Sequence, residues 1–172
     1  PPFNVQPAGP RPEGEEIRFA TTDGLTLAGS LYRHTDRPSL GTIVFCPELD
    51  GNHWAAMSYC EGLWNAGFDI FAFDFRNQGA SDTLPGYEPL HWLTEYEVDD
   101  ALAAVDYVQG RADLETSKLG IFGISRGGGA ALATAARRQE VSGAVCEGVF
   151  STEALLTHYT VRWAALYIPV WL

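Results

Sequence analysis

The pentapeptide Gly123-Ile124-Ser125-Arg126-Gly127 lies between two stretches of different character. Residues 118–122, before it, form a short and mainly apolar run that is typical of a buried strand. Residues 128–136, after it, are mostly alanine and glycine and predict a helix. A Gly-x-Ser-x-Gly motif between a strand and a helix predicts a nucleophile elbow, a tight turn that lifts a serine hydroxyl clear of the sheet. Ser125 is therefore the candidate nucleophile.

The glycines of this motif have a predicted steric role. In such a turn, the residues two before and two after the serine approach neighbouring backbone, so Gly123 and Gly127 are the elbow glycines. Gly128 and Gly129 are expected to let the helix pack closely on the preceding strand. The alternative is a chance match, because the chain contains 18 glycines. The flanking strand and helix favour the functional interpretation.

Composition narrows the possible partners. The chain has 172 residues, the size of one domain, and 11 basic against 22 acidic residues give it a net charge of −11. A strongly acidic chain is not expected to bind nucleic acid or anionic membranes, because both carry negative charge. Its three cysteines are an odd number without metal-ligand spacing, which predicts no disulfide framework and no zinc site. The sequence also implies no other metal and no cofactor. The longest apolar stretch, 161–172, is too short to span a bilayer.

Hydrophobic patterning predicts the order of the elements. Residues 1–14 are rich in proline and predict an extended lead. Alternation on either side of Asp23-Gly24 predicts a β-hairpin, and apolar strands then alternate with helices. Thr94 is expected to cap one helix and Gly67 to end another. The sequence therefore predicts an α/β fold, with a mostly parallel sheet covered by helices on both faces. The expected strands after the hairpin are 42–46, 68–73, 118–122 and 141–146, and the expected helices are 53–66, 94–109 and 128–136.

Three motifs in this order resemble those of the α/β-hydrolase superfamily, serine esterase and lipase type. They are residues 45–52 (FCPELDGN), residues 74–82 (DFRNQGASD, similar to the family's D-x-R-G-x-G-x-S) and the Gly-x-Ser-x-Gly motif. The resemblance covers about residues 15–172. Residues 147–151 (EGVFS) are also similar to the single-domain hydrolases related to prolyl oligopeptidase.

The resemblance implies a fold and a set of roles. The α/β-hydrolase core would occupy 15–150, and 151–172 would begin a helical lid or cap, with the chain truncated after the sixth strand and the start of this lid. Ser125 would form the acyl-enzyme, and the backbone N–H groups of Leu49 and Arg126 would form the oxyanion hole. Pro47-Glu48 replaces the family's His-Gly, so the Glu48 carboxylate is expected to point away from the developing charge.

Two polar residues in the second motif have alternative interpretations. Asp74 and Arg76 are acidic and basic residues that could act in catalysis. We favour a structural role, in which they hold their loop through hydrogen bonds and an ion pair.

The general base is not evident in the sequence. In this fold the chain order is serine, then acid, then histidine. The four histidines are His34, His53, His91 and His158, and only His158 follows Ser125, with Glu147 and Glu153 before it. Nothing in the sequence places His158 within hydrogen-bond reach of the serine, so a solvated or packed histidine is the favoured interpretation. His53 and His91 fall in loops that could face the cleft, and His158 falls in the expected lid. We therefore expect the base and its acid from a C-terminal portion outside this chain.

Two classes of function remain open. The first is a serine esterase for a small-molecule ester, completed by a C-terminal fragment or another subunit that covers the sheet edge at 141–146. The second is a catalytically silent, hydrolase-like binding module. A thioesterase or peptidase would share every motif described. The sequence leaves the location open, either cytoplasmic or secreted after removal of an N-terminal segment.

Overall fold

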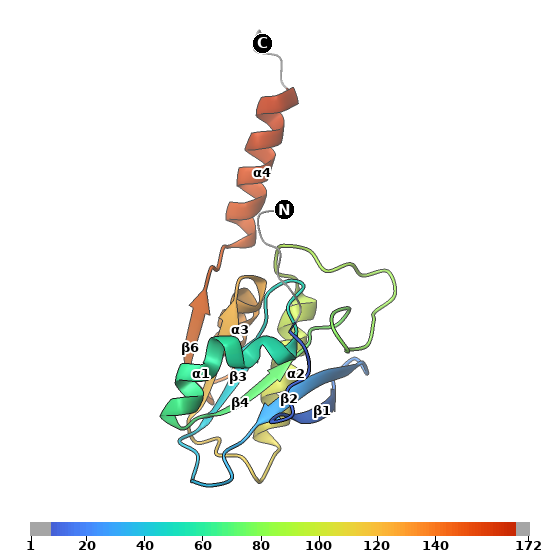
Figure 1. Cartoon of the computed structure of the whole chain (residues 1–172). Helices are drawn as coiled ribbons and strands as arrows, with labels where there is room; N and C mark the ends of the chain where they lie inside the picture. The colour runs from blue at the N-terminus through green and yellow to red at the C-terminus, as the bar shows by residue number, and fades with distance from the viewer. Residues whose placement is uncertain (1–7, 168–172) are drawn as a thin grey trace.

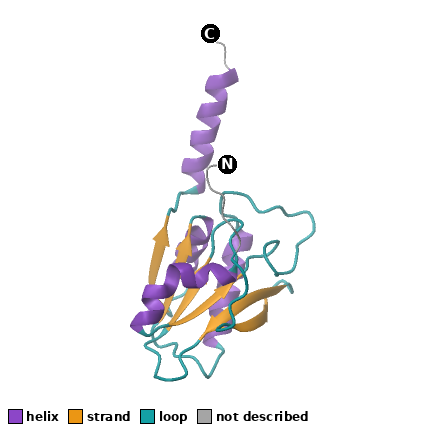
Figure 2. Cartoon of the chain, viewed as in Figure 1, coloured by secondary structure: helices purple, strands orange, loops and turns teal. Residues whose placement is uncertain are grey.

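The fold is a six-stranded sheet with helices on both faces (Figures 1 and 2). The computed structural model describes residues 8–167. Its strands are β1 (Glu15–Ala20), β2 (Thr26–Tyr32), β3 (Thr42–Cys46), β4 (Asp69–Phe73), β5 (Leu119–Ile124) and β6 (Val141–Glu147). Its helices are the short η1 (His53–Ala55), α1 (Ala56–Ala66), α2 (Glu95–Gln109), α3 (Arg126–Arg137) and α4 (Thr152–Tyr167).

The sheet has the strand order β1-β2-β4-β3-β5-β6. The β1–β2 hairpin is antiparallel and turns at Gly24, whose φ of 89° suits glycine. β2 pairs antiparallel with β4, whereas β4, β3, β5 and β6 run parallel to one another. The predicted hairpin and mostly parallel sheet are therefore confirmed. The carboxyl ends of the four parallel strands meet at one edge, where a site in this class of fold is expected.

Alternate residues of the central strands build two separate cores. In β3, Val44 and Cys46 pack in the cluster that contains α2 and α3, while Ile43 and Phe45 pack in the cluster that contains α1. β4 divides in the same way, with Phe71 in the first cluster. Figure 1 shows α1 in front of the sheet and α2 and α3 behind it. Helices on both faces explain why these strands are apolar throughout rather than alternating.

The predicted helix boundaries are confirmed at two caps. Thr94 is the N-cap of α2 and forms a capping box with Glu97, whose carboxylate accepts the Thr94 N–H at 2.8 Å. Gly67 follows α1 with a φ of 111°. The segment expected as one helix over 53–66 begins instead as the three-residue η1 before α1.

β6 and α4 form the outer part of the molecule. β6 lies at the edge of the sheet with mostly exposed residues, and α4 extends from its end away from the sheet (Figure 1). Large apolar side chains on both elements are exposed, among them Val145 and Val161. That 151–172 begins a lid remains a prediction, and residues 168–172 lie outside the described part. Among the described helices, none has the length and apolarity needed to cross a membrane.

A buried ion pair ties the loop after β4 to α2. The Arg76 side chain is fully buried, and its Nε and Nη2 donate to Asp100 Oδ1 at 2.9 and 2.7 Å. The Arg76 backbone N–H donates to the other carboxylate oxygen at 2.8 Å, and Nη1 donates to Asp23 at 2.7 Å. Burial raises the pKa of Asp100 to about 6, although Arg76 acts in the opposite direction. Arg76 therefore has the structural ion pair expected from the sequence.

Replacing Asp100 with alanine should destabilise the fold strongly. Asp100→Ala leaves the Arg76 charge buried without its main partner, which costs about 3–5 kcal/mol of unfolding free energy. Asp106→Ala is the matched control, since Asp106 lies on the same helix and pairs with Arg138 at 2.7 Å on the exposed surface. It should cost at most about 1 kcal/mol. Urea unfolding of both variants measures the difference, and equal losses would contradict this account of Arg76.

Candidate active site

Ser125 lies between β5 and α3 in a strained backbone conformation. Its φ and ψ are 52° and −119°, which a residue other than glycine adopts at a cost of about 1–3 kcal/mol. Two hydrogen bonds hold it there. The Ser125 N–H donates to Glu147 O at 2.7 Å, and the Ser125 carbonyl accepts the Gly129 N–H at 3.2 Å. The residue is nevertheless exposed, so its hydroxyl stands at the carboxyl edge of the sheet.

The elbow glycines stand where no side chain fits. A Cβ on Gly123 would lie 2.4 Å from Gly127 O. A Cβ on Gly127 would lie 2.2 Å from Pro47 O and 2.3 Å from Cys46 O. All three are backbone atoms that cannot swing aside. The start of α3 is therefore pressed against the end of β3.

The next two glycines differ from each other. A Cβ on Gly128 would meet Gly123 O at 2.9 Å, so this residue does let α3 approach the strand. A Cβ on Gly129 would meet only the Leu93 side chain, at 3.5 Å, an ordinary contact. The expectation that Gly129 packs on the strand was wrong, because this face of α3 lies against the loop before α2.

The two predicted oxyanion donors lie on segments that touch. Leu49 belongs to a turn in which the Gly51 N–H donates to Glu48 O at 3.0 Å, and Arg126 is the first residue of α3. Gly127 joins the two segments through its contact with Pro47. Among the described residues, neither the Leu49 nor the Arg126 N–H has a hydrogen-bond partner. Two free donors therefore lie near the candidate nucleophile, and their catalytic role remains a prediction.

The Glu48 side chain is directed toward α1. Its Oε1 accepts a hydrogen bond from the Tyr59 hydroxyl at 2.9 Å, and the Tyr59 ring stacks on Phe45. Burial, reinforced by Glu48, raises the pKa of Tyr59 to about 12, so the phenol keeps its proton and remains the donor. The acidic residue that replaces the family's glycine is thus engaged with a neighbouring helix.

The Arg126 side chain is held in the protein interior. Its Nη1 donates to Glu97 Oε1 at 3.2 Å and to Leu90 O at 3.3 Å, and the guanidinium lies over the Phe75 ring. Nε and Nη2 are buried and have no partner among the described residues. The side chain fixes the first turn of α3 to α2, which leaves the backbone N–H as the group that Arg126 offers at the site.

Asp74 joins the two loops that follow β3 and β4. One carboxylate oxygen accepts the His53 N–H at 2.6 Å, and the other lies 2.9 Å from His53 Nδ1 and accepts the Ala80 N–H at 2.8 Å. This confirms the structural interpretation of Asp74. The sequence left open that His53 faces the cleft, and the structure excludes this because the His53 side chain is fully buried.

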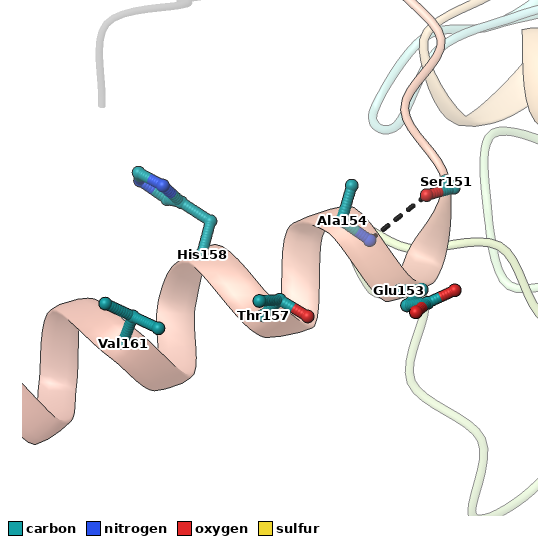
Figure 3. A pocket seen from close by; sticks show the side chains of 6 residues that line it. All are labelled: Ser151, Glu153, Ala154, Thr157, His158 and Val161. Carbon is teal, nitrogen blue, oxygen red and sulfur yellow. Dashed lines mark hydrogen bonds between the residues drawn. The ribbon is translucent and has the colours of Figure 1, made fainter.

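The other histidines do not approach Ser125 as a base would. His34 Nδ1 lies 3.1 Å from Asp69 Oδ1, but Asp69 begins β4 and so marks the opposite end of the parallel strands. His158 projects from α4 beside a hollow of about 520 Å³, and the described residues that line it all fall within 151–161 (Figure 3). Among the described residues, none hydrogen-bonds to the Ser125 hydroxyl. Within residues 8–167, no three or more His, Cys, Asp or Glu side chains are grouped so that they could hold a metal ion.

Comparison with known proteins identifies the family. The family model described as alpha/beta hydrolase fold matches residues 17–169. The chain belongs to this family. It is 34% identical over 132 residues to the uncharacterised protein YfhR of Salmonella typhimurium, covering 73% of this chain and 42% of YfhR. It is 29% identical over 126 residues to the thiohydrolase aneE of Aspergillus aculeatus, covering 70% and 36%.

Solved structures show the same fold. An esterase of Pyrococcus furiosus superposes with a TM-score of 0.73 at 21% identity, covering 92% of this chain and 57% of the esterase. An acetyl xylan esterase from a Paenibacillus species gives a TM-score of 0.71 at 21% identity, covering 96% and 61%. The chain thus spans about half the length of the proteins it matches.

Two supporting residues were missed in the sequence. Gln78 Oε1 accepts the Asp50 N–H at 2.9 Å and so reaches the turn that carries Leu49. Glu97, which completes the capping box of α2, also accepts the hydrogen bond that holds the Arg126 side chain. Both contacts join segments far apart in the chain, and no local pattern signals them.

Substitution of two glycines in α3 tests the contact at the start of that helix. Gly127→Ala should destabilise the fold by about 1–3 kcal/mol or more, because its Cβ would overlap two carbonyl oxygens. Gly129→Ala, two residues along the same helix, should be neutral or stabilise by up to about 1 kcal/mol, since alanine is the better helix former. Thermal unfolding distinguishes them. Two variants of equal stability would show that α3 does not approach β3 so closely.

Proposed function

We propose that this protein is a serine hydrolase that acts on carboxylic esters through an acyl-enzyme on Ser125. The observation that carries the proposal is the exposed, strained serine at the carboxyl edge of the sheet, beside the Leu49 turn. Backbone strain at an exposed residue is retained where the surroundings enforce it, and such residues cluster at functional sites. Membership of the alpha/beta hydrolase fold family supports the same assignment.

The chemistry follows from the groups present. The Ser125 hydroxyl adds to the acyl carbon and gives its proton to a histidine base. The negative charge that forms on the carbonyl oxygen is held by the N–H groups of Leu49 and Arg126, helped by the positive end of the α3 dipole. The alcohol leaves with the proton, and water then hydrolyses the acyl-enzyme by the same steps.

The base and its acid are proposed to lie outside residues 1–172. The matched relatives are about twice as long as this chain, which leaves room for both groups in a longer protein. The exposed outer edge of β6, beside Glu147 whose carbonyl holds Ser125, is where further strands would bring them close.

Thioesters are the second candidate substrate class. The likeness to a thiohydrolase favours them, and the same nucleophile and donors would serve a thiol leaving group. A panel of p-nitrophenyl esters and acyl thioesters of graded chain length separates the two classes through their kcat/KM values.

Ser125→Ala should abolish turnover in the full-length protein that contains this chain. Loss of the nucleophile lowers kcat by at least about 10⁴-fold and prevents labelling by a fluorophosphonate probe. Ser117→Ala is the matched control, since Ser117 is exposed before β5, at the opposite end of that strand from Ser125. It should label and turn over like the unchanged protein. An unchanged protein that binds esters without turnover or labelling would instead be a silent binding module, and the proposal would be withdrawn.

A further inference from the structure

We propose that Gln78 is a positioning residue that holds the turn carrying Leu49 in its active form. The inference rests on the proposed function, because it concerns the turn that bears one proposed oxyanion donor. Gln78 belongs to the loop after β4, and the turn belongs to the loop after β3. The contact is one hydrogen bond, from the Asp50 N–H to Gln78 Oε1 at 2.9 Å.

The turn adopts a form that is costly for its sequence. The Gly51 N–H donates to Glu48 O, which closes a four-residue turn with Leu49 and Asp50 at its centre. Asp50 has a φ of 64°, whereas Leu49 is not among the residues with positive φ. This combination is a type II turn, which favours glycine at the third position. The commoner type I turn closes the same hydrogen bond without a left-handed residue.

The two turn types differ by rotation of one peptide, and Gln78 binds that peptide. Converting type II into type I rotates the Leu49–Asp50 peptide plane and carries the Asp50 N–H away from its acceptor. The Gln78 side chain is buried, with the residue 8% exposed, so an acceptor left unpaired there is costly. Its Nε2 has no partner among the described residues, and the bond to Asp50 is therefore what orients the side-chain amide. Gln78 thus favours the type II form.

Gln78 is itself firmly placed. Its backbone N–H donates to Phe75 O at 3.1 Å, and its carbonyl accepts the Ser81 N–H at 3.1 Å. Ser81 in turn donates to Asp74 O at 2.7 Å. The acceptor that selects the turn is therefore attached to a loop fixed to the end of β4.

The consequence for catalysis is on kcat rather than KM. The Leu49 N–H lies in the preceding peptide, which stays in place, but the rotation reverses the dipole of the Leu49–Asp50 peptide next to it. The electrostatic field is thereby changed beside an oxyanion that forms only in the transition state. Such a change lowers kcat while substrate binding is largely kept.

Gln78→Met tests the inference in the full-length protein. Methionine has a similar size but offers no comparable acceptor, so the left-handed Asp50 then disfavours the type II form by a factor of about 5 or more. We expect kcat for the best ester to fall about 5-fold or more, with KM changed less than about 2-fold. Gln139→Met is the matched control, because Gln139 is exposed beyond the far end of α3. It should leave both constants unchanged.

Asp50→Gly provides a rescue that a packing role would not allow. Glycine adopts positive φ without penalty, so the double variant Gln78→Met/Asp50→Gly should regain kcat to within about 2-fold of the Asp50→Gly protein. Asp50 is exposed, which makes the glycine variant tolerable by itself. An unchanged kcat in Gln78→Met, or failure of the glycine to restore it, overturns the inference.

Hydrogen exchange tests the hydrogen bond between Gln78 and the Asp50 N–H without a measurement of activity. The Asp50 amide, followed in the peptide spanning residues 47–52, should exchange faster in Gln78→Met than in Gln139→Met. Equal exchange overturns the inference even if the protein turns over no ester. Absence of turnover in the unchanged protein, with faster exchange in Gln78→Met, overturns the proposed function but supports the role of Gln78 in holding the turn.

Discussion

The site depends on a contact between two pieces of backbone that leaves no room for a side chain. At Gly127 the first turn of α3 meets the carbonyls of Cys46 and Pro47 at the end of β3. Sheet pairing alone would set β3 and β5 side by side, but it would not fix how far the helix after one stands from the loop after the other. The missing Cβ fixes that distance. The close packing of α3 against the end of β3 therefore sets the position of Ser125 relative to the turn that contains Leu49.

Buried charges then hold the loops that the contact brings together. Asp74 binds the His53 N–H and the Ala80 N–H, so it fastens the loop after β3 to the loop after β4. Arg76 fastens the second loop to α2, and Arg126 fastens the start of α3 to the same helix through Glu97. Such groups stabilise little relative to apolar packing, yet each has few positions in which its hydrogen bonds are satisfied. They specify loop geometry, which apolar contacts alone would leave variable.

Local rules in the sequence predict the elements but not the partners. The hairpin at Gly24, the cap at Thr94 and the glycine that ends α1 each depend on a few neighbouring residues, and all three are as expected. The burial of His53 depends on Asp74, which accepts its backbone N–H, and the direction of the Glu48 side chain depends on its hydrogen bond with Tyr59. The space beside Gly129 is bounded by Leu93, which is 36 positions earlier in the chain. These pairings follow from how the loops pack at the sheet edge, and no spacing in the sequence encodes them.

Backbone strain in the described chain is concentrated where the site is proposed. Its three non-glycine residues with positive φ are Asp50, Asn77 and Ser125, and they follow β3, β4 and β5 in turn. Each is held by a specific hydrogen bond: Asp50 by Gln78, Ser125 by Glu147, and Asn77 by the Leu84 N–H, which its side chain accepts at 2.7 Å. A fold that needed these loops only as connections would place glycine at such positions, because glycine carries no penalty there. Among the described residues the Asp50 side chain makes no hydrogen bond, so the bond from the Asp50 backbone N–H to Gln78 is the contact that holds its left-handed conformation.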